Sequence, residues 1–200
     1  VCYAFVAQSG VNFYKTSDGG ANWTLLTKPV DADAGIGNDI TRTQFWYDMS
    51  IAVDPTNDAV VFVGGVDLFK STNSGSTWQQ ISHWYGGFGF QDVHADQHIA
   101  IFEPGNSSVI YFGNDGGIWQ SKNATALIPT ITSKHDNYNV TQFYHCAIHP
   151  TAYTNYFLFF SQDNGSHQFT QGGIGPTSEV SGGDGCFVHI DQNEPQYQFT

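Results

Sequence analysis

Short apolar segments recur along the whole chain, and residues typical of turns separate them. Four such segments have an acidic residue or a histidine next to their last quoted residue: SIAVDP from Ser50, IAIFEP from Ile99, CAIHP from Cys146 and FVHIDQ from Phe187. The polar ends, from Asp54 to Asp191, are spaced by 49, 46 and 42 residues. A spacing sustained in this way indicates an internal structural repeat.

Each repeat contains further strand-like segments. A second apolar run follows in AVVFVGG, SVIYFGN, NYFLFFSQ and QYQFT, and YAFVA from Tyr3 is an additional copy. A third run is present in NFYKT, DLFKS, GIWQS and SHQFT, and a fourth is visible as WTLL and WQQI but faint later in the chain. Runs this short, without an apolar helical period, predict β-strands.

Four strands per repeat predict a particular architecture. A four-stranded unit has two apolar faces, and stacking such units around an axis buries both. We therefore predict an all-β protein, a β-propeller built from four-stranded antiparallel blades. The rival, an open sandwich, does not explain the sustained period. Five second strands against four first strands indicate a partial arc of a larger propeller, with blades at approximately 1–28, 48–83, 97–134, 143–180 and, incomplete, 186–200.

Two similar turns connect third strands to fourth strands, in KTSDGGANWTLL and KSTNSGSTWQQI. The Asp18 carboxylate can accept hydrogen bonds from amides of its own turn. Gly20 tolerates a positive φ angle, and Trp23 can lie in the seam between blades. The predicted structural residues of the two turns are Thr16, Asp18, Gly20 and Trp23, and Ser71, Asn73, Gly75 and Trp78.

These turns resemble the Asp-box, or BNR, repeat with the pattern S/T-x-D-x-G-x-T/N-W. In that family the box is a folding device remote from the active face, so the resemblance implies a structural corner and not a ligand site. Longer phrases, including HADQHIAIFEPGN, YFGNDGGIWQS and SQDNGSHQFT, resemble secreted bacterial Asp-box propellers related to sortilin-type and xyloglucanase-type domains. The resemblance implies a fold and a secreted or cell-surface location, while a fold alone does not decide function.

Composition narrows the range of partners. The 200 residues carry 18 acidic and six basic side chains, for a net charge of -12. Nucleic acid is an unfavourable partner because phosphate neutralisation needs clustered cations, and an anionic membrane surface is disfavoured for the same reason. No segment is long and apolar enough to span a bilayer. The chain begins at Val1 without a signal peptide, so we expect a processed product or a fragment.

Cysteines and glycosylation motifs leave alternatives open. Three cysteines are too few for a disulfide scaffold. Cys146 and Cys186 occupy equivalent strands, so a bridge is conceivable, and buried free thiols are the other expectation for the cysteines, Cys2 included. Asn22 is best explained as a turn residue. The remaining N-x-S/T motifs supply the glycosylation candidates Asn106, Asn123, Asn139 and Asn164.

Propeller topology assigns the chemistry-bearing loops to one end. The connections into first strands and the loops between second and third strands share one face, here called the upper face. The Trp-containing turns and the loops after the first strands share the lower face. Rings stack on sugar faces and carboxylates accept hydroxyl donors, so a mixture of both suits a carbohydrate. The candidate ligand-binding residues of the upper face are Trp46, Tyr47, Asp48, His94, Asp96, His98, Asp115, Gln162, Asp163 and Asp184.

Metal binding has a structural alternative at each candidate. On a strand, His94, Asp96 and His98 would point the same way and could bind a transition metal. A hydrogen-bonded polar network is the favoured interpretation, because no fourth ligand has a recognisable spacing. Asp115 and Asp163 could be acids of calcium loops, but ordinary Asx turns are the favoured interpretation. We predict no metal and no cofactor, with calcium as the candidate ion if one binds.

Catalytic signatures are sparse. A glycosidase needs two carboxylates about 5 to 9.5 Å apart, and sequence cannot supply such separations. Sialidases that share the box hold their substrate with an arginine cluster, and this chain has only Arg42. A serine-nucleophile elbow, a P-loop and a Rossmann fingerprint are absent. The two catalytic aspartates of xyloglucanases match no motif here.

Three functions remain as hypotheses. The first is a secreted or cell-surface module, non-catalytic in this portion, that binds a glycan or an extracellular protein through its upper face. The second is a glycoside hydrolase, xyloglucanase-like, using an upper-face aspartate pair. The third is a structural component of an extracellular filament or surface layer. In each case the remaining blades, from the same or a longer chain, are expected partners.

Overall fold

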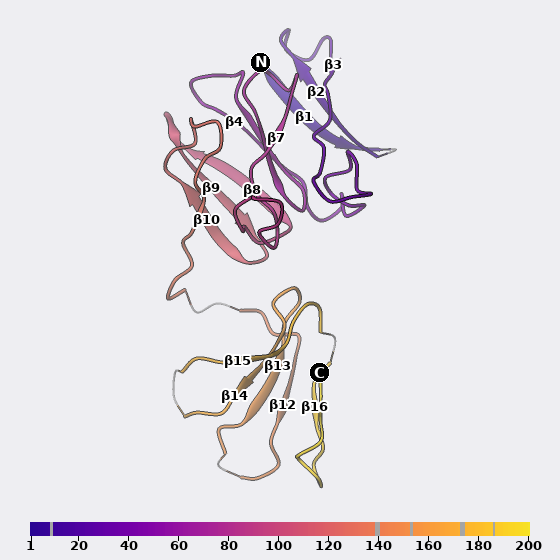
Figure 1. Ribbon diagram of the computed structural model, residues 1–200, viewed down its shortest axis with the longest axis vertical. Helices are drawn as coiled ribbons and strands as arrows, with labels where there is room; N and C mark the ends of the chain where they lie inside the picture. Colours follow the sequence, from indigo (N-terminus) through magenta and orange to yellow (C-terminus); the bar gives the residue numbers. More distant parts are fainter. Residues whose placement is uncertain (9, 139–140, 153, 173–174, 186) are drawn as a thin grey trace. The chain divides into compact units, whose positions relative to one another are not determined.

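The chain folds into β-strands and connecting loops. The computed structural model describes residues 1–8, 10–138, 141–152, 154–172, 175–185 and 187–200. These residues contain no helix, and therefore no helix long and apolar enough to cross a membrane. They form two compact units, Val1–Asp136 and Asn137–Thr200, each described by itself (Figure 1).

The first unit contains three antiparallel sheets, called the first, second and third blades. In each blade the strands follow chain order from one edge to the other. The first consists of β1 (Cys2–Ala7), β2 (Val11–Thr16) and β3 (Thr24–Leu25). The second consists of β4 (Ser50–Val53), β5 (Val61–Gly64), β6 (Leu68–Ser71) and β7 (Gln79–Gln80). The third consists of β8 (Gln97–Glu103), β9 (Asn106–Asn114), β10 (Gly117–Ser121) and β11 (Thr132–Ser133).

The second unit continues the same pattern. Its fourth blade contains β12 (His145–Ile148), β13 (Phe157–Phe160), β14 (Ser166–Phe169) and β15 (Ser178–Ser181). A two-stranded hairpin follows, with β16 (His189–Ile190) and β17 (Gln198–Phe199). The predicted all-β class with four-stranded antiparallel blades is therefore confirmed. Fourth strands β3, β7 and β11 have only two residues each, which explains their faint signal in the sequence.

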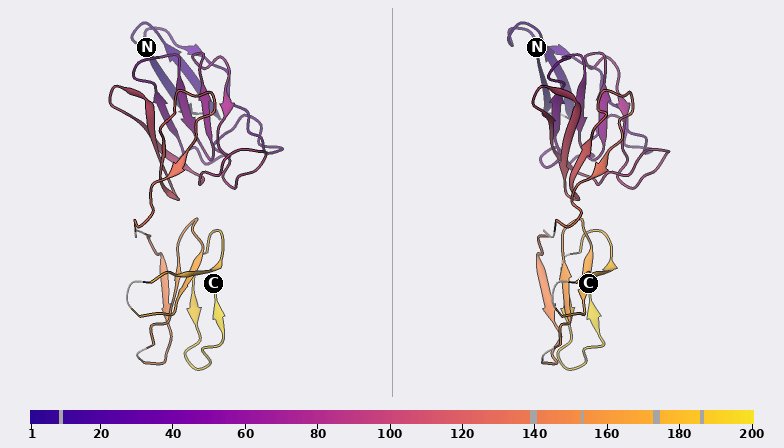
Figure 2. Two further views of the ribbon diagram at one scale, coloured as in Figure 1. Left: turned by 60° about the vertical axis from the view of Figure 1, so that its left-hand side comes forward. Right: turned by 90° about the vertical axis from the view of Figure 1, so that its left-hand side faces the viewer.

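The second blade is buried on both faces. Val61 and Val63 belong to the apolar cluster with Phe13 of the first blade, whereas Phe62 and Leu68 belong to the cluster with the third blade. Side chains that alternate along β5 therefore pack against two neighbouring blades, because the pleat points successive side chains to opposite faces of the sheet. Figure 2 shows the three sheets of this unit next to one another from two sides. Burial of both faces explains why the run AVVFVGG is continuously apolar.

Side-chain hydrogen bonds hold the Trp-containing turns. In the first turn Thr16 Oγ1 donates to Asp18 Oδ1 at 2.8 Å and accepts from the Gly20 amide at 3.0 Å. The Asn22 amide donates to Asp18 Oδ1 at 3.0 Å, so Asn22 is a turn residue. The second turn repeats these bonds with Ser71, Asn73, Gly75 and Thr77. Gly20 and Gly75 have φ angles of 96° and 77°, which glycine adopts without a Cβ clash.

A third copy of this turn lies in the third blade, where sequence analysis missed it. Ser121 Oγ donates to Asn123 Oδ1 at 3.0 Å, and the Thr130 amide donates to the same oxygen at 2.8 Å. The segment lacks the glycine and the tryptophan of the pattern. Only the Ser-x-Asn core remains, and that pair is too common to be recognised by sequence alone. Asn123, a glycosylation candidate, therefore has its side-chain oxygen engaged in this turn.

Long side chains on the lower face connect neighbouring blades. Trp78 Nε1 donates to the Thr27 carbonyl at 2.9 Å, and its ring lies 5.5 Å from that of Phe13. Lys70 is buried and donates to the carbonyls of Ala124 and Ala126 at 2.7 and 2.5 Å. Trp78 thus lies in a seam between blades, whereas Trp23 is 47% exposed.

Two cysteines are exposed, which differs from the expectation of buried free thiols. Cys2 and Cys146 are free and exposed, so buried thiols are the wrong interpretation for these two residues. Each lies at an exposed position of a strand whose next residue is partly buried, and strand alternation accounts for the difference. Cys186 and the glycosylation candidate Asn139 lie outside the described residues.

Candidate functional site

Loops far apart in the sequence meet at the upper face of the first unit. The Val66 amide, in the β5–β6 loop, donates to the Ile40 carbonyl at 2.9 Å. The Asp96 amide donates to the Val66 carbonyl at 3.2 Å, and the Gln97 amide donates to the Gly65 carbonyl at 2.8 Å. These backbone bonds join the connections that lead into β4 and β8. These hydrogen bonds therefore join the upper-face loops into one continuous surface.

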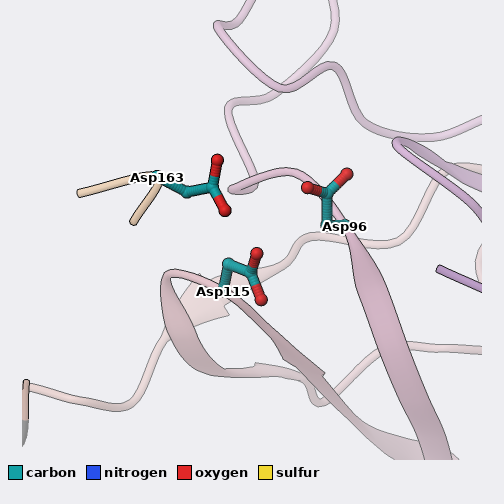
Figure 3. A group of neighbouring side chains, drawn as sticks. All are labelled: Asp96, Asp115 and Asp163. Atoms are coloured by element: carbon teal, nitrogen blue, oxygen red, sulfur yellow. The ribbon is translucent and has the colours of Figure 1, made fainter. Parts of the chain in front are cut away.

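Asp96 and Asp115 bring two carboxylates together on this face (Figure 3). An oxygen of Asp96 lies within 4.8 Å of an oxygen of Asp115. Asp115 accepts hydrogen bonds from the Tyr47 hydroxyl at 2.8 Å and from His98 Nε2 at 2.6 Å. His98 Nδ1 lies 3.2 Å from the Tyr47 carbonyl. Four predicted residues thus form one contiguous polar group.

Asp48 is buried and does not lie at the exposed rim. Its exposed fraction is 0%, and both carboxylate oxygens lack a hydrogen-bond partner. Burial and the nearby Asp96 carboxylate raise the pKa of Asp48 to about 8. Burial, followed by the charge of Asp115, also raises the pKa of Asp96. Asp48 was predicted at the rim and is buried in this structure, while its role in ligand binding stays a prediction.

The expectation of one shared strand face for His94, Asp96 and His98 is also wrong. Strand β8 begins only at Gln97, and Asp96 has a left-handed φ of 63°. That backbone reversal breaks the alternation on which the prediction depended. His94 instead packs over Gly116, where an added Cβ would lie 2.4 Å from the His94 side chain. His98 turns to Asp115.

Exposed aromatic rings accompany the carboxylates. Trp46 is 76% exposed, and its ring lies 5.5 Å from that of Tyr47, which hydrogen-bonds Asp115. The connection between β7 and β8 adds further exposed rings from Trp84, Tyr85 and Phe88. Apolar side chains that stay in water next to polar groups mark a surface suited to binding.

Arg42 forms a second charged cluster that sequence analysis did not identify. Its Nη2 atom lies 3.0 Å from Asp31, 2.7 Å from Asp33 and 3.4 Å from Asp67. The Tyr85 hydroxyl donates to Asp33 at 3.1 Å. The signal in the sequence is the run DADAGIGND ahead of the single arginine, but its partner Asp67 is 25 residues from Arg42.

Burial changes the acidity of this cluster. Asp67 is fully buried, and its desolvation, with the charge of Asp31, raises its pKa to about 7 despite the opposing charge of Arg42. The ion pairs with Arg42 instead lower the pKa of the more exposed Asp33, against a desolvation effect in the other direction. The cluster ties the loop around Asp31 to the β5–β6 loop and holds the aromatic connection in place through Tyr85.

The second unit brings its own three predicted residues together. The Asp163 amide donates to Asp184 Oδ1 at 2.9 Å, and Asp163 has a left-handed φ of 57°. The Tyr144 hydroxyl donates to Gln162 Oε1 at 3.0 Å. An open pocket in this unit is lined by Tyr144, Phe160, Gln162, Asp184 and Gly185. Asp163 and Asp184 are therefore neighbours within this unit, as the predicted upper-face loops require.

Comparison with known proteins gives similarity of fold only. No protein-family model and no curated protein matches the chain. Among solved structures, the GH74 xyloglucanase from Xanthomonas campestris is 11% identical, with a TM-score of 0.45, over 92% of this chain and 35% of that chain. YCF48 bound to D1 peptide is 12% identical, with a TM-score of 0.42, over 86% and 47%. The Cps50 (Swd1) β-propeller domain from Myceliophteria thermophila is 10% identical, with a TM-score of 0.40, over 94% and 58%.

The chain is shorter than the structures it resembles. It spans from 28% to 59% of their lengths. The chain's own successive four-stranded antiparallel sheets, with strands in chain order, are those expected of β-propeller blades. Identities of this size carry no information about activity or ligand, so the function has to be argued from the side chains.

Proposed function

We propose that the chain is a glycan-binding β-propeller module whose ligand lies on the upper face of the first unit. The observation that carries the proposal is the 76% exposure of Trp46 beside Tyr47, whose hydroxyl is bonded to Asp115. An exposed indole offers a flat apolar surface to a sugar ring, while carboxylate oxygens accept the hydrogen bonds of sugar hydroxyls. Both features occur within one contiguous group of residues.

Charge narrows the class of glycan. The chain has a net charge of -12, and the partly exposed Asp115 carboxylate, with the buried Asp96 carboxylate next to it, belongs to the surface in question. Polyanionic glycans would be repelled by this field, so a neutral polysaccharide is the proposed ligand. The likeness of the turns to the Asp-box repeat, and of longer phrases to sortilin-type propellers, supports a secreted or cell-surface location as part of the proposal. An extracellular protein is the alternative partner.

A glycan array followed by calorimetric titration of the strongest neutral ligand tests the proposal. Replacing Trp46 with alanine should weaken binding by about tenfold or more, the loss expected for a stacked ring. Trp23→Ala is the matched control, because Trp23 is also an exposed tryptophan, at 47%, but belongs to a lower-face turn. Equal affinity in wild type and Trp46→Ala, or an equal loss in both variants, would refute the assignment of the surface.

A second candidate, a glycoside hydrolase, is favoured by one observation. Oxygens of Asp96 and Asp115 lie within 4.8 Å of each other. Retaining glycosidases place their two carboxyl groups about 5 to 5.5 Å apart, and one of them has a raised pKa so that it can act as the acid. Burial raises the pKa of Asp96, which gives it the acid role in this candidate. Reducing-sugar release that disappears in Asp115→Asn and Asp96→Asn would support hydrolysis, whereas binding without turnover would favour the binding module.

A further inference from the structure

The pocket of the second unit is built by three connections of the fourth blade. It is lined by Tyr144 directly before β12, Phe160 at the end of β13, Gln162 in the β13–β14 loop, and Asp184 and Gly185 after β15. Its volume is about 390 Å³. Ligand pockets of proteins span about 300 to 1,000 Å³, so this pocket suits one side chain or one small molecule and not a polysaccharide chain.

Packing holds the aromatic wall of this pocket in one geometry. The rings of Tyr144 and Phe160 are stacked, with their centres 5.9 Å apart and an angle of 23° between their planes. The Tyr144 hydroxyl donates to Gln162 Oε1 at 3.0 Å, and the Tyr144 amide donates to the Phe160 carbonyl at 2.9 Å. A Cβ added at Gly185 would lie 2.5 Å from the Phe160 ring, so the backbone packs closely there. The wall is therefore preorganised for a ligand.

Asp184 adds a carboxylate that is held in place. Its side chain is exposed, and its Oδ1 atom accepts a hydrogen bond from the Asp163 amide at 2.9 Å. This bond joins the β13–β14 loop to the connection after β15. Among the described residues, no lysine, arginine or histidine forms an ion pair with Asp184. The pocket therefore presents a negative charge that has no basic partner in the described part of the chain.

The second unit also has no permanent cation of its own. All six lysine and arginine residues of the chain lie before residue 135. Residues 137–200 instead carry five acidic side chains, which are Asp163, Glu179, Asp184, Asp191 and Glu194. A surface with charge of one sign attracts ligands of the opposite sign. The charge of this unit thus favours a cationic ligand in the pocket.

The side chains that line the pocket offer mainly hydrogen-bond acceptors. The ionised Asp184 carboxylate has only acceptor oxygens. The Tyr144 hydroxyl already donates its hydrogen to Gln162, so its oxygen is left as an acceptor. Among these lining side chains, only the Gln162 amide nitrogen can donate to a ligand. An ammonium group has three donors and no acceptor, whereas a sugar hydroxyl is both, so the pocket is more complementary to an ammonium group.

We propose that this pocket binds a lysine side chain of a partner protein. The lysine ammonium group donates to the Asp184 carboxylate, and its apolar stem lies against the rings of Tyr144 and Phe160. A cation next to an aromatic ring gains further electrostatic attraction. The proposal does not depend on the glycan proposal, because it concerns the second unit and is measured with amines, so either can fail while the other stands.

Titration of the isotope-labelled complete chain with Nα-acetyl-lysine N-methylamide, followed by amide chemical shifts in NMR spectra, is the test. The lysine derivative should shift the signals of Gln162, Asp184 and Gly185 with millimolar affinity. The norleucine analogue, which lacks the ammonium group, and glucosamine, which lacks the apolar stem, should give no saturable shift. Asp184→Asn should weaken binding of the lysine derivative by about tenfold or more, because it removes a charge-assisted hydrogen bond. Asparagine Oδ1 can still accept from the Asp163 amide, so the loop should be preserved.

Controls make each outcome decisive. Glu194→Gln removes the same charge from an exposed residue of this unit that does not line the pocket, and it should leave the affinity unchanged. The dispersion of the amide signals establishes that each variant is folded. The proposal is overturned if the lysine derivative shifts none of the pocket signals, if Asp184→Asn binds it as tightly as Glu194→Gln does, or if the norleucine analogue or glucosamine binds equally well. Tighter binding of glucose at the same signals would make the pocket a sugar site and would overturn the proposal too.

Discussion

Individual aspartates in this chain differ in chemistry because of their surroundings and not because of their type. Asp18 accepts hydrogen bonds from the Asn22 amide and side chain and from Thr16, which lower its pKa to about 2. Asp67 is buried beside Asp31, and desolvation raises its pKa to about 7. Hydrogen bonds stabilise the charged form, whereas burial penalises it. The same residue type is therefore a stabilised carboxylate in the turn at Asp18, whereas at Asp67 its protonated form is favoured up to a higher pH.

Asp67 should make stability depend on pH. Its pKa rises from 3.8 in the unfolded chain to about 7 in the folded protein. The folded state therefore holds more protons between about pH 4 and 7, and the free energy of unfolding should fall across that window by on the order of a few kcal/mol. Urea denaturation at several pH values should show a flatter dependence in Asp67→Asn.

Asp18→Asn is the control for this measurement. The lowered pKa of Asp18 stabilises the fold above about pH 4, and that stabilisation disappears as the pH falls towards 2. Its replacement should leave the slope between pH 4 and 7 unchanged. An unaltered slope in Asp67→Asn would contradict the assignment of that proton to Asp67.

At the scale of the elements, the second blade depends on close backbone approach. The β5–β6 loop touches the connection that leads into β4, through the hydrogen bond from Val66 to the Ile40 carbonyl. A Cβ added at Gly65 would lie 2.2 Å from the Ile40 oxygen and 2.6 Å from its carbonyl carbon. The atoms that would have to move belong to the backbone. Glycine is required at this position by contact.

Gly65→Ala should therefore destabilise the first unit. Overpacking against backbone costs about 1 to 3 kcal/mol, measured as a lower free energy of unfolding in urea. Gly175→Ala is the matched control, because its nearest neighbours would lie at 3.6 to 3.9 Å, an ordinary contact distance. If both variants unfold at the same urea concentration as wild type, the contact at Ile40 does not constrain the fold.

At the scale of the whole molecule, the apolar cores are separate. Two clusters, which include Phe62 and Phe13, lie within residues 1–136, and a third, which includes Leu158 and Phe160, lies within residues 137–200. The first unit buries both faces of its central blade by its own residues. We therefore expect its stability to arise chiefly from contacts inside it.

A fragment of residues 1–136 should fold. Its two internal clusters predict a single cooperative unfolding transition, followed by tryptophan fluorescence and far-ultraviolet circular dichroism in urea. A broad transition with binding of a hydrophobic dye in the absence of urea would show that the first unit needs the rest of the chain.

Local patterns were sufficient for the fold. Apolar runs such as AVVFVGG, bounded by turn residues, identified the strands because alternation and turn chemistry act over a few neighbouring residues. The turns at Asp18 and Asn73 were identified for the same reason. The related turn at Asn123 was missed, because it has the same hydrogen bonds but lacks the glycine and the tryptophan of the pattern.

The site depended on contacts that sequence does not contain. Asp115 was predicted on the upper face from the order of the strands, but its bonds to Tyr47 and His98 join segments 68 and 17 residues apart. Asp48 was expected at the surface and is buried, and the cluster around Arg42 was not anticipated. The amino-acid sequence by itself determined the strands, the turns and the end of the blades that carries the reactive side chains, because these follow from local periodicity and chain direction. Only the tertiary structure decided which carboxylates are buried, paired or exposed, because burial and pairing depend on which distant loops come to lie against each other.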